Sequence, residues 1–222
     1  MLQLLFATAL AATPPSTCQP DLRPGEALIE RRSLKTQGGA LEAVALGNPD
    51  PETSSSRALV LVLGRDCKLL FEQSFDGATQ IRFSEGRLGA QPFLFVTTFR
   101  QGGSGCAYEH LILAYGGEMD AEDGVQPLAP MPLGHGNMDG IFVGDLGRGR
   151  GPGLVSWTAE WDGAHYAPHR YQVVTYAWRD GRFVGPKIRL TKRKHDPEPE
   201  AVAKSLGFSF GDMTQQARFG EC

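Results

Sequence analysis

The amino-acid sequence predicts an all-β fold made of about three consecutive four-stranded antiparallel units, followed by a short C-terminal helix. Three observations predict this class. The 28 Gly and 15 Pro residues exceed what an average chain of 222 residues contains, which indicates many tight turns. Between those turns lie short runs rich in β-branched and aromatic residues. In addition, one strand–turn–strand pattern occurs more than once along the chain.

The expected elements follow one another without long gaps. The expected strands are 26–34, 41–47, a hairpin over 57–75 with its turn near 64–66, 79–85, 92–101, 109–115, 140–146, 153–161, 170–178 and 182–192. Polar residues 48–56 read as a loop. Only 196–207 is typical of a helix, because Asp196 can cap its start, Pro199 can lie in its first turn and Gly207 can end it.

Two stretches, 86–119 and 149–183, have the same layout. Each runs from a strand through a glycine-rich or polar turn into a strand that ends in an aromatic residue, and a fainter unit covers 26–75. Pro92 and Pro152 are 60 residues apart, and Tyr115 and Trp178 are 63 apart. Such a period indicates units that bury their apolar faces by stacking on one another, whereas the alternative is a chance likeness of two β-hairpins.

The N-terminal residues 1–12 have the features of a signal peptide. Residues 2–12 carry no charge and are too few to span a bilayer, and Ala9 and Ala11 supply the small residues of a cleavage site, although no Lys or Arg precedes the apolar run. We expect 13–24 to be a tether, 25–195 the β-repeat domain, and 196–222 the helix and tail. The expected location is therefore periplasmic or secreted, with no transmembrane segment in the mature chain. The alternatives are a misassigned start codon, a disordered apolar tail and a lipid-modified Cys18.

Export would place the four cysteines in an oxidising compartment, where an even number favours disulfides. Three pairings are possible. We favour Cys67 with Cys106, because both lie near turns of expected hairpins, and Cys18 with Cys222, because chain termini often lie close together. Free thiols in a protein that stays in the cytoplasm are the alternative.

A family resemblance rests on the stretch "FVGDLGRGRGPGLVSW", 142–157, followed by "YAWRDGRFV", 176–184. These residues resemble the FG-GAP/VCBS-type repeat of integrin-like β-propellers. The resemblance implies that the predicted units are consecutive propeller-type blades. Three blades are few for a closed ring, so the array is either an open arc with covered ends or part of a self-associating assembly.

In that family an Asp-led loop supplies calcium ligands from its positions 1, 3, 5 and 9. Here only the first is acidic: the four positions hold Asp145, Gly147, Gly149 and Gly153, and Arg148 and Arg150 add positive charge. Calcium requires six to eight oxygen ligands, so we expect no metal here. We expect Asp145 to organise the turn, by accepting hydrogen bonds from the N–H groups of 147–149 or by pairing with Arg148 or Arg150.

The main candidate binding surface is the loop "EWDGAHYAPHRY". It belongs to an aromatic set of Trp157, Trp161, Tyr166, Tyr171, Tyr176 and Trp178. Such residues commonly pack between blades. If the loop instead leaves Trp161 and Tyr166 exposed beside Asp162, His165 and His169, a sugar or a peptide can stack there.

Evidence for catalysis is weak. A metal-dependent enzyme or metal-binding module would use the His and Asp residues of the 135–169 region, namely His135, Asp139, Asp145, His165 and His169. However, Pro168 and the flanking strands deprive the i, i+4 spacing of His165 and His169 of its helical meaning. Ser104 lies between expected strands, not at the strand-to-helix elbow of a hydrolase.

The net charge of −3 argues against a nucleic-acid partner. The basic run 186–195 is typical of an edge strand protected against pairing, and the alternative is a contact with phosphate, an acidic polysaccharide or anionic lipid. The sequence therefore favours a non-catalytic exported binding or scaffold module without a cofactor, which acts on an unknown envelope protein or glycan.

Overall fold

The structure is a computed structural model, and it describes most of the chain between Cys18 and Gly207. The described residues are 18–36, 39–48, 57–64, 66–78, 80–102, 105–116, 124–129, 133–136, 139–147, 149–161, 163–164, 166–197 and 199–207.

The described strands form three antiparallel sheets that follow one another along the chain. The first contains β1 (Ala27–Thr36), β2 (Gly39–Gly47), β3 (Arg57–Leu63) and β4 (Leu69–Asp76), in that order. The second contains β5 (Gln80–Leu88), β6 (Gln91–Gly102), β7 (Gly105–Tyr115) and β8 (Val125–Pro127), with β9 (Leu133–Gly136) also paired to β7. The third contains β10 (Gly140–Asp145), β11 (Pro152–Ala159), β12 (Tyr171–Arg179) and β13 (Arg182–Leu190), and α1 (Pro199–Leu206) follows it.

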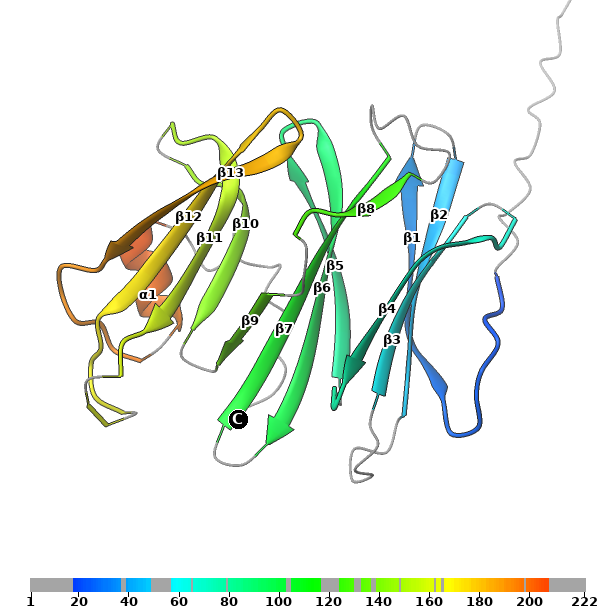
Figure 1. The fold of residues 1–222 in the computed structure, drawn as a ribbon, viewed down its shortest axis with the longest axis horizontal. Helices are drawn as coiled ribbons and strands as arrows, with labels where there is room; N and C mark the ends of the chain where they lie inside the picture. The colour runs from blue at the N-terminus through cyan, green and yellow to red at the C-terminus, as the bar shows by residue number, and fades with distance from the viewer. Residues whose placement is uncertain are drawn as a thin grey trace, which may run out of the picture.

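This architecture confirms the all-β class, the three four-stranded units and the C-terminal helix. The two stretches with the same layout contain β6–β7 and β11–β12, which are the second and third strands of their sheets. Figure 1 shows the sheets in a row, with the first sheet at one end, the third at the other, and no ring closed by the described residues. The first strands of successive sheets meet along this open arc, because β5 contacts β1 on one side and β10 on the other.

Two apolar layers hold the three sheets together. Between the first and second sheets, Val60 and Val62 pack with Leu94, Val96 and other buried side chains. Between the second and third sheets, a second layer includes Phe93, Phe95, Ile112, Ile141 and Leu154. Successive residues of β6 thus enter opposite layers, as the alternation of side chains along a strand requires.

Polar side chains also join the first two sheets at the edge strand β5. The Phe83 N–H donates to Glu30 Oε2 at 3.0 Å, and Arg32 Nη2 donates to the Phe83 carbonyl at 3.2 Å. Arg32 and Glu30 form an ion pair at 2.9 Å. Two side chains of β1 therefore satisfy backbone groups of β5 that a neighbouring strand would otherwise pair.

The outer face of the third sheet is covered by α1. Val202, Ala203 and Leu206 of the helix pack on Trp157, Tyr171 and other side chains of β10, β11 and β12. The helix begins at Pro199, where a missing N–H costs nothing, and Gly207 follows its last residue with φ of 88°. One end of the arc is therefore closed by a helix and not by another sheet.

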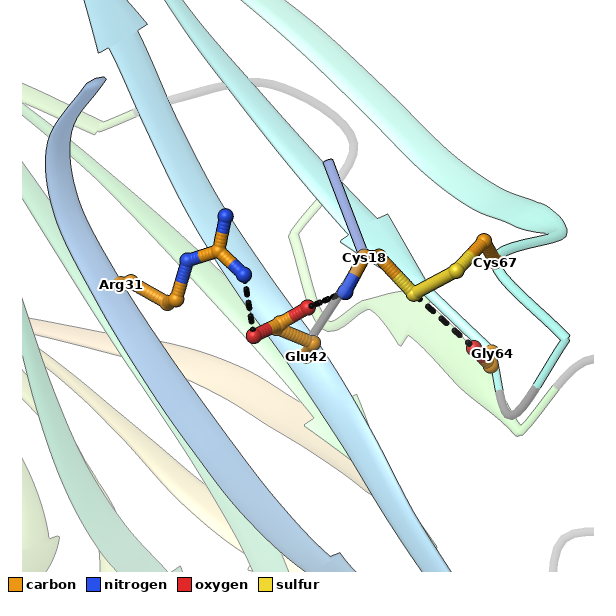
Figure 2. The surroundings of a disulfide bond; sticks show 5 residues. All are labelled: Cys18, Arg31, Glu42, Gly64 and Cys67. Atoms are coloured by element: carbon orange, nitrogen blue, oxygen red, sulfur yellow. Dashed lines mark hydrogen bonds and ion pairs between the residues drawn. A yellow bond between two sulfur atoms is a disulfide. The ribbon is translucent and has the colours of Figure 1, made fainter. Parts of the chain in front are cut away.

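The outer face of the first sheet is also buried, and Cys18 belongs to its apolar cluster. That cluster contains Val44, Leu46, Leu59, Leu61 and Leu63 beside Cys18, which is 4% exposed. Figure 2 shows how Cys18 is fixed: it forms a disulfide with Cys67, and its N–H donates to Glu42 Oε2 at 3.0 Å. Glu42 in turn pairs with Arg31 at 2.8 Å.

The pairing of Cys67 with Cys106 and of Cys18 with Cys222 is wrong, because Cys18 and Cys67 bond to each other across 49 residues. Cys67 follows the third strand of its sheet, whereas Cys106 is the second residue of the third strand of the next sheet. Successive connections in an antiparallel sheet lie at opposite ends, so these two turns lie at opposite edges of the arc (Figure 1). The side chain of Cys106 and all of Cys222 lie outside the described residues.

Candidate functional site: the loop between β11 and β12

The candidate binding loop spans residues 160–170 and joins β11 to β12. Its base is closed by a hydrogen bond from the Glu160 N–H to the Arg170 carbonyl at 2.8 Å. Within it, the Ala167 N–H donates to the Ala164 carbonyl at 2.8 Å, which forms a tight turn. Asp162 and His165, two of the candidate binding residues, lie outside the described residues.

His169 fills the interior of this loop. It is fully buried, and its Nδ1 and Nε2 lie 3.0 Å from the carbonyl oxygens of Glu160 and Ala164, respectively. Its backbone forms a two-hydrogen-bond bridge with His195, at 2.9 and 2.8 Å. His169 therefore holds two loop carbonyl oxygens from inside the loop. The sequence analysis considered it as a surface residue beside Trp161 and Tyr166, but its side chain is buried.

Two aromatic side chains project from the braced loop into solvent. Trp161 is 60% exposed and Tyr166 is 87% exposed. The centroid of the Trp161 ring lies 5.9 Å from that of the His169 ring in a tilted arrangement, so the exposed indole packs against the buried imidazole. The hydrogen bonds of Glu160 and Ala167, the residues next to Trp161 and Tyr166, hold the described backbone beside each aromatic residue.

The other aromatic residues of the set belong to the interior. Trp157 and Tyr171 are almost completely buried under α1, and Tyr176 and Trp178 pack against the layer between the second and third sheets. β11 ends at Ala159, so the alternation that places Trp157 in the core does not extend to Trp161. The structure thus divides the set into packing residues and exposed ones.

Tyr171 lies in the core immediately after the loop. Burial first, and then the charges of Asp139 and Asp196, raise the pKa of its phenol to about 12. Among the described residues, its hydroxyl has no hydrogen-bond partner. The neutral phenol is therefore the form that this core accommodates.

The carboxylate of Asp139 accepts backbone hydrogen bonds near the base of the loop. Its Oδ1 accepts from the Ala159 N–H at 2.8 Å, and its Oδ2 accepts from the Gly136 N–H at 3.1 Å. Both oxygens thus hold the end of β11 to the connection between β9 and β10. The side chain of His135 lies outside the described residues. Within the described part of the chain, no three His, Cys, Asp or Glu residues are grouped as metal ligands.

The Asp145 loop is a glycine-rich turn. Asp145 Oδ1 accepts from the Gly147 N–H at 2.9 Å, and Gly147, Gly149 and Gly151 adopt φ of 62°, 71° and 72°. A Cβ at Gly153, where the resembled family has its last acidic ligand, would overlap the Tyr176 carbonyl oxygen of β12. This position has no room for a carboxylate.

Arg150 provides a cation within the same loop. Its guanidinium donates to the carbonyl oxygens of Leu146 and Gly147, the latter at 3.2 Å, and it reaches the Leu206 carbonyl at 3.5 Å. The last of these is at the C-terminal end of α1, where the helix dipole favours positive charge. The arginine thus holds the loop and the helix together, while Arg148 lies outside the described residues.

Sequence reasoning missed several residues that fix these features. No local pattern identifies these residues, because their partners lie far away in the chain. They are Glu42, His195, Glu30 and Arg32.

Ser104, the serine considered for hydrolysis, lies outside the described residues.

Comparisons with protein-family models, with curated proteins and with solved structures give no match for this chain. No helix in the described part of the chain is both long and apolar enough to cross a membrane.

Proposed function

We propose that this protein is an exported, non-catalytic binding module whose partner, an envelope protein or a glycan, stacks on Trp161 and Tyr166. One observation carries the proposal: two large aromatic side chains are 60% and 87% exposed on a loop in which a buried histidine holds the carbonyl oxygens of Glu160 and Ala164. Exposing such rings is unfavourable unless a partner covers them, and a fixed loop loses little conformational entropy on binding.

The arrangement of the sheets is compatible with this function. The array of three sheets and the Asp145 turn are the features that support a degenerate FG-GAP/VCBS-type blade array, in which loops at the blade edges make the contacts. In our proposal Arg150 replaces the loop cation, because its guanidinium already lies against the loop carbonyls. Export of the chain rests on the N-terminal residues and on the disulfide, which requires an oxidising compartment.

The disulfide also bears on the alternative of a lipid anchor. The Cys18 thiol is consumed by its bond to Cys67, so it is not free to carry a lipid. We therefore propose a mature protein that begins after the signal peptide and retains Cys18 in its disulfide with Cys67. N-terminal sequencing of the protein from the periplasmic fraction tests this: a lipid-modified Cys18 at the N-terminus contradicts it.

The test of the binding surface uses Trp161→Ala and Tyr166→Ala. Bound envelope proteins are identified by crosslinking and mass spectrometry, and bound glycans on an array. We expect each variant to lose about tenfold or more in affinity while its melting temperature stays within about 2 °C of the parent. Leu69→Ala is the matched control, because Leu69 is 48% exposed on β4 of the first sheet.

Two results contradict the proposal. Unchanged binding by both aromatic variants would show that the loop is not the contact surface. Stoichiometric zinc or calcium in the purified protein, retained through dialysis against a chelator, would instead support a metal-dependent module.

A further inference from the structure

The strand β13 is a nine-residue edge strand with an exposed surface. Among the described strands it pairs only with β12, and eight of its residues are exposed while Phe183 is half-buried. The proposed function makes no use of this strand.

The hydrogen-bond register shows which backbone groups of β13 point away from the sheet. The Thr191 N–H donates to the Tyr171 carbonyl at 2.9 Å, so this pair is hydrogen-bonded. In an antiparallel ladder such pairs alternate with non-hydrogen-bonded ones. Arg189 and Lys187 therefore bond to β12, whereas the N–H and C=O groups of Ile188 and Leu190 point outward, where another strand can pair with them.

The two faces of β13 differ in chemistry. Arg189 lies opposite Val173, whose side chain faces α1, and Lys187 lies on the same face. Ile188 and Leu190 lie on the other face, opposite Val174 and Gln172, and they are 58% and 39% exposed. Over residues 187–190, cations and apolar side chains thus lie on opposite faces of one exposed edge, whereas Val184, beyond the register shift, lies on the α1 side opposite Ala177.

Charge limits what can pair with this edge. Residues 181–195 contain six Lys or Arg residues and no acid, although the whole chain carries a net charge of −3. An antiparallel second copy of β13 would place cations opposite cations, which is destabilising. An incoming strand with acidic residues on the α1 side and apolar residues on the other side would instead match the exposed positions 187–190.

We propose that β13 binds an extended segment of a partner protein in which acidic and apolar residues alternate. The segment adds a strand to the third sheet: its backbone pairs with the outward groups of Ile188 and Leu190, its acids lie opposite Lys187 and Arg189, and its apolar side chains lie beside Ile188. A polysaccharide would use the cations but neither the backbone groups nor the apolar row.

The test measures binding of a fluorescent, end-blocked peptide of alternating glutamate and valine to the full mature chain by anisotropy. We expect saturable binding that weakens as salt is raised. Arg189→Glu should weaken it about tenfold or more, and Arg23→Glu, at an exposed site in the N-terminal segment, should not.

Ile188→Pro separates strand addition from simple charge attraction. It removes an outward N–H and leaves the ladder to β12 intact, so it should abolish peptide binding, whereas Ile188→Val should not. Circular dichroism and thermal melting establish that each variant is folded. Should the proline variant not fold, a peptide methylated on alternate backbone nitrogens serves instead, and it should fail to bind the parent protein.

Several outcomes overturn the proposal. These are no binding at about 1 mM peptide, equal binding of a sequence in which glutamates and valines are segregated, and undiminished binding after both Ile188→Pro and backbone methylation. Tight binding of an acidic polysaccharide that Arg189→Glu weakens and Ile188→Pro does not would assign the edge to glycans.

Discussion

The disulfide between Cys18 and Cys67 should be the largest single contribution to stability outside the apolar layers. The perturbation is the double replacement Cys18→Ser and Cys67→Ser, which leaves no unpaired thiol from this bond. The bond closes a segment of 49 residues that includes β1, β2 and β3. It also holds Cys18 in the cluster on the outer face of the first sheet.

The magnitude follows from chain entropy. For a sequence separation of 49, closing the loop in the unfolded chain corresponds to about 4 kcal/mol at 25 °C. Each kcal/mol shifts the melting temperature of a domain of this size by about 2–4 °C, so the expected loss is roughly 8–16 °C. Serine in place of buried Cys18 adds a smaller penalty of the same sign, because its hydroxyl is placed among apolar side chains.

The assay is equilibrium unfolding in urea, in which parent and variant are fitted with the same dependence of the unfolding free energy on urea concentration. Peptide mapping of the parent under non-reducing conditions identifies its disulfides. Limited proteolysis should cleave the variant, and not the parent, between Cys18 and Glu26. A loss below about 1 kcal/mol would refute the reasoning, as would a peptide map that links Cys67 to any cysteine other than Cys18. If every cysteine is oxidised, the same map should link the remaining pair, Cys106 and Cys222.

Three further predictions concern contacts described above. Glu30→Ala should lower the free energy of unfolding in urea by about 1–3 kcal/mol, because it leaves the Phe83 N–H unsatisfied. In the double variant this loss should not add to that of Arg32→Ala, since both side chains bind Phe83. Additive losses would show that the two side chains act separately. Arg150→Met should cost about 1–2 kcal/mol and increase amide exchange in α1, and added calcium should not restore either; recovery with calcium would contradict the assignment of the guanidinium as the loop cation. The pKa of Tyr171 is raised to about 12 in the folded protein, so on raising the pH the unfolded chain loses this phenol proton first. The contribution of Tyr171 to the free energy of unfolding should therefore be complete below pH 10 and be lost between about pH 10 and 12, which amounts to up to roughly 2–3 kcal/mol. Tyr171→Phe should flatten this fall, and an unchanged alkaline slope would contradict the assignment.

The covered ends of the arc matter for the oligomeric state. A repeat array needs capping elements with a polar outer surface, and here α1 covers one end while the N-terminal segment that begins at Cys18 is fixed to the other. Of the two alternatives that the sequence left open, we propose the open arc with covered ends. Sedimentation of the mature chain as a monomer is the corresponding expectation.

Much of the fold could be predicted because it is encoded locally. The apolar run of β3 and the turn residues around Gly64 and Gly181 locate strands and hairpins without knowledge of any distant residue. The Asp145 loop could be interpreted for the same reason, because the missing ligands are neighbours in the chain. In contrast, β8 and β9, with three and four residues, are too short to produce a periodic pattern.

The candidate site could be predicted only in part. The sequence grouped Trp157 and Trp161 on one face, but β11 ends between them, so one is in the core and the other in solvent. It placed His169 among the binding residues, but the imidazole lies inside the loop, where it binds carbonyl oxygens from both sides.

The sequence by itself determined the class of the fold, the succession of hairpins and the loss of metal ligands at Asp145. These depend on backbone preferences and periodicities that act between near neighbours in the chain. Only the tertiary structure decided the partner of Cys67, the burial of the outer faces of the first and third sheets, the exposure of Trp161 and the placement of cations and apolar residues on opposite faces of residues 187–190. Each depends on which residues distant in sequence lie side by side, and that is set by how whole sheets pack and at which edge each turn emerges.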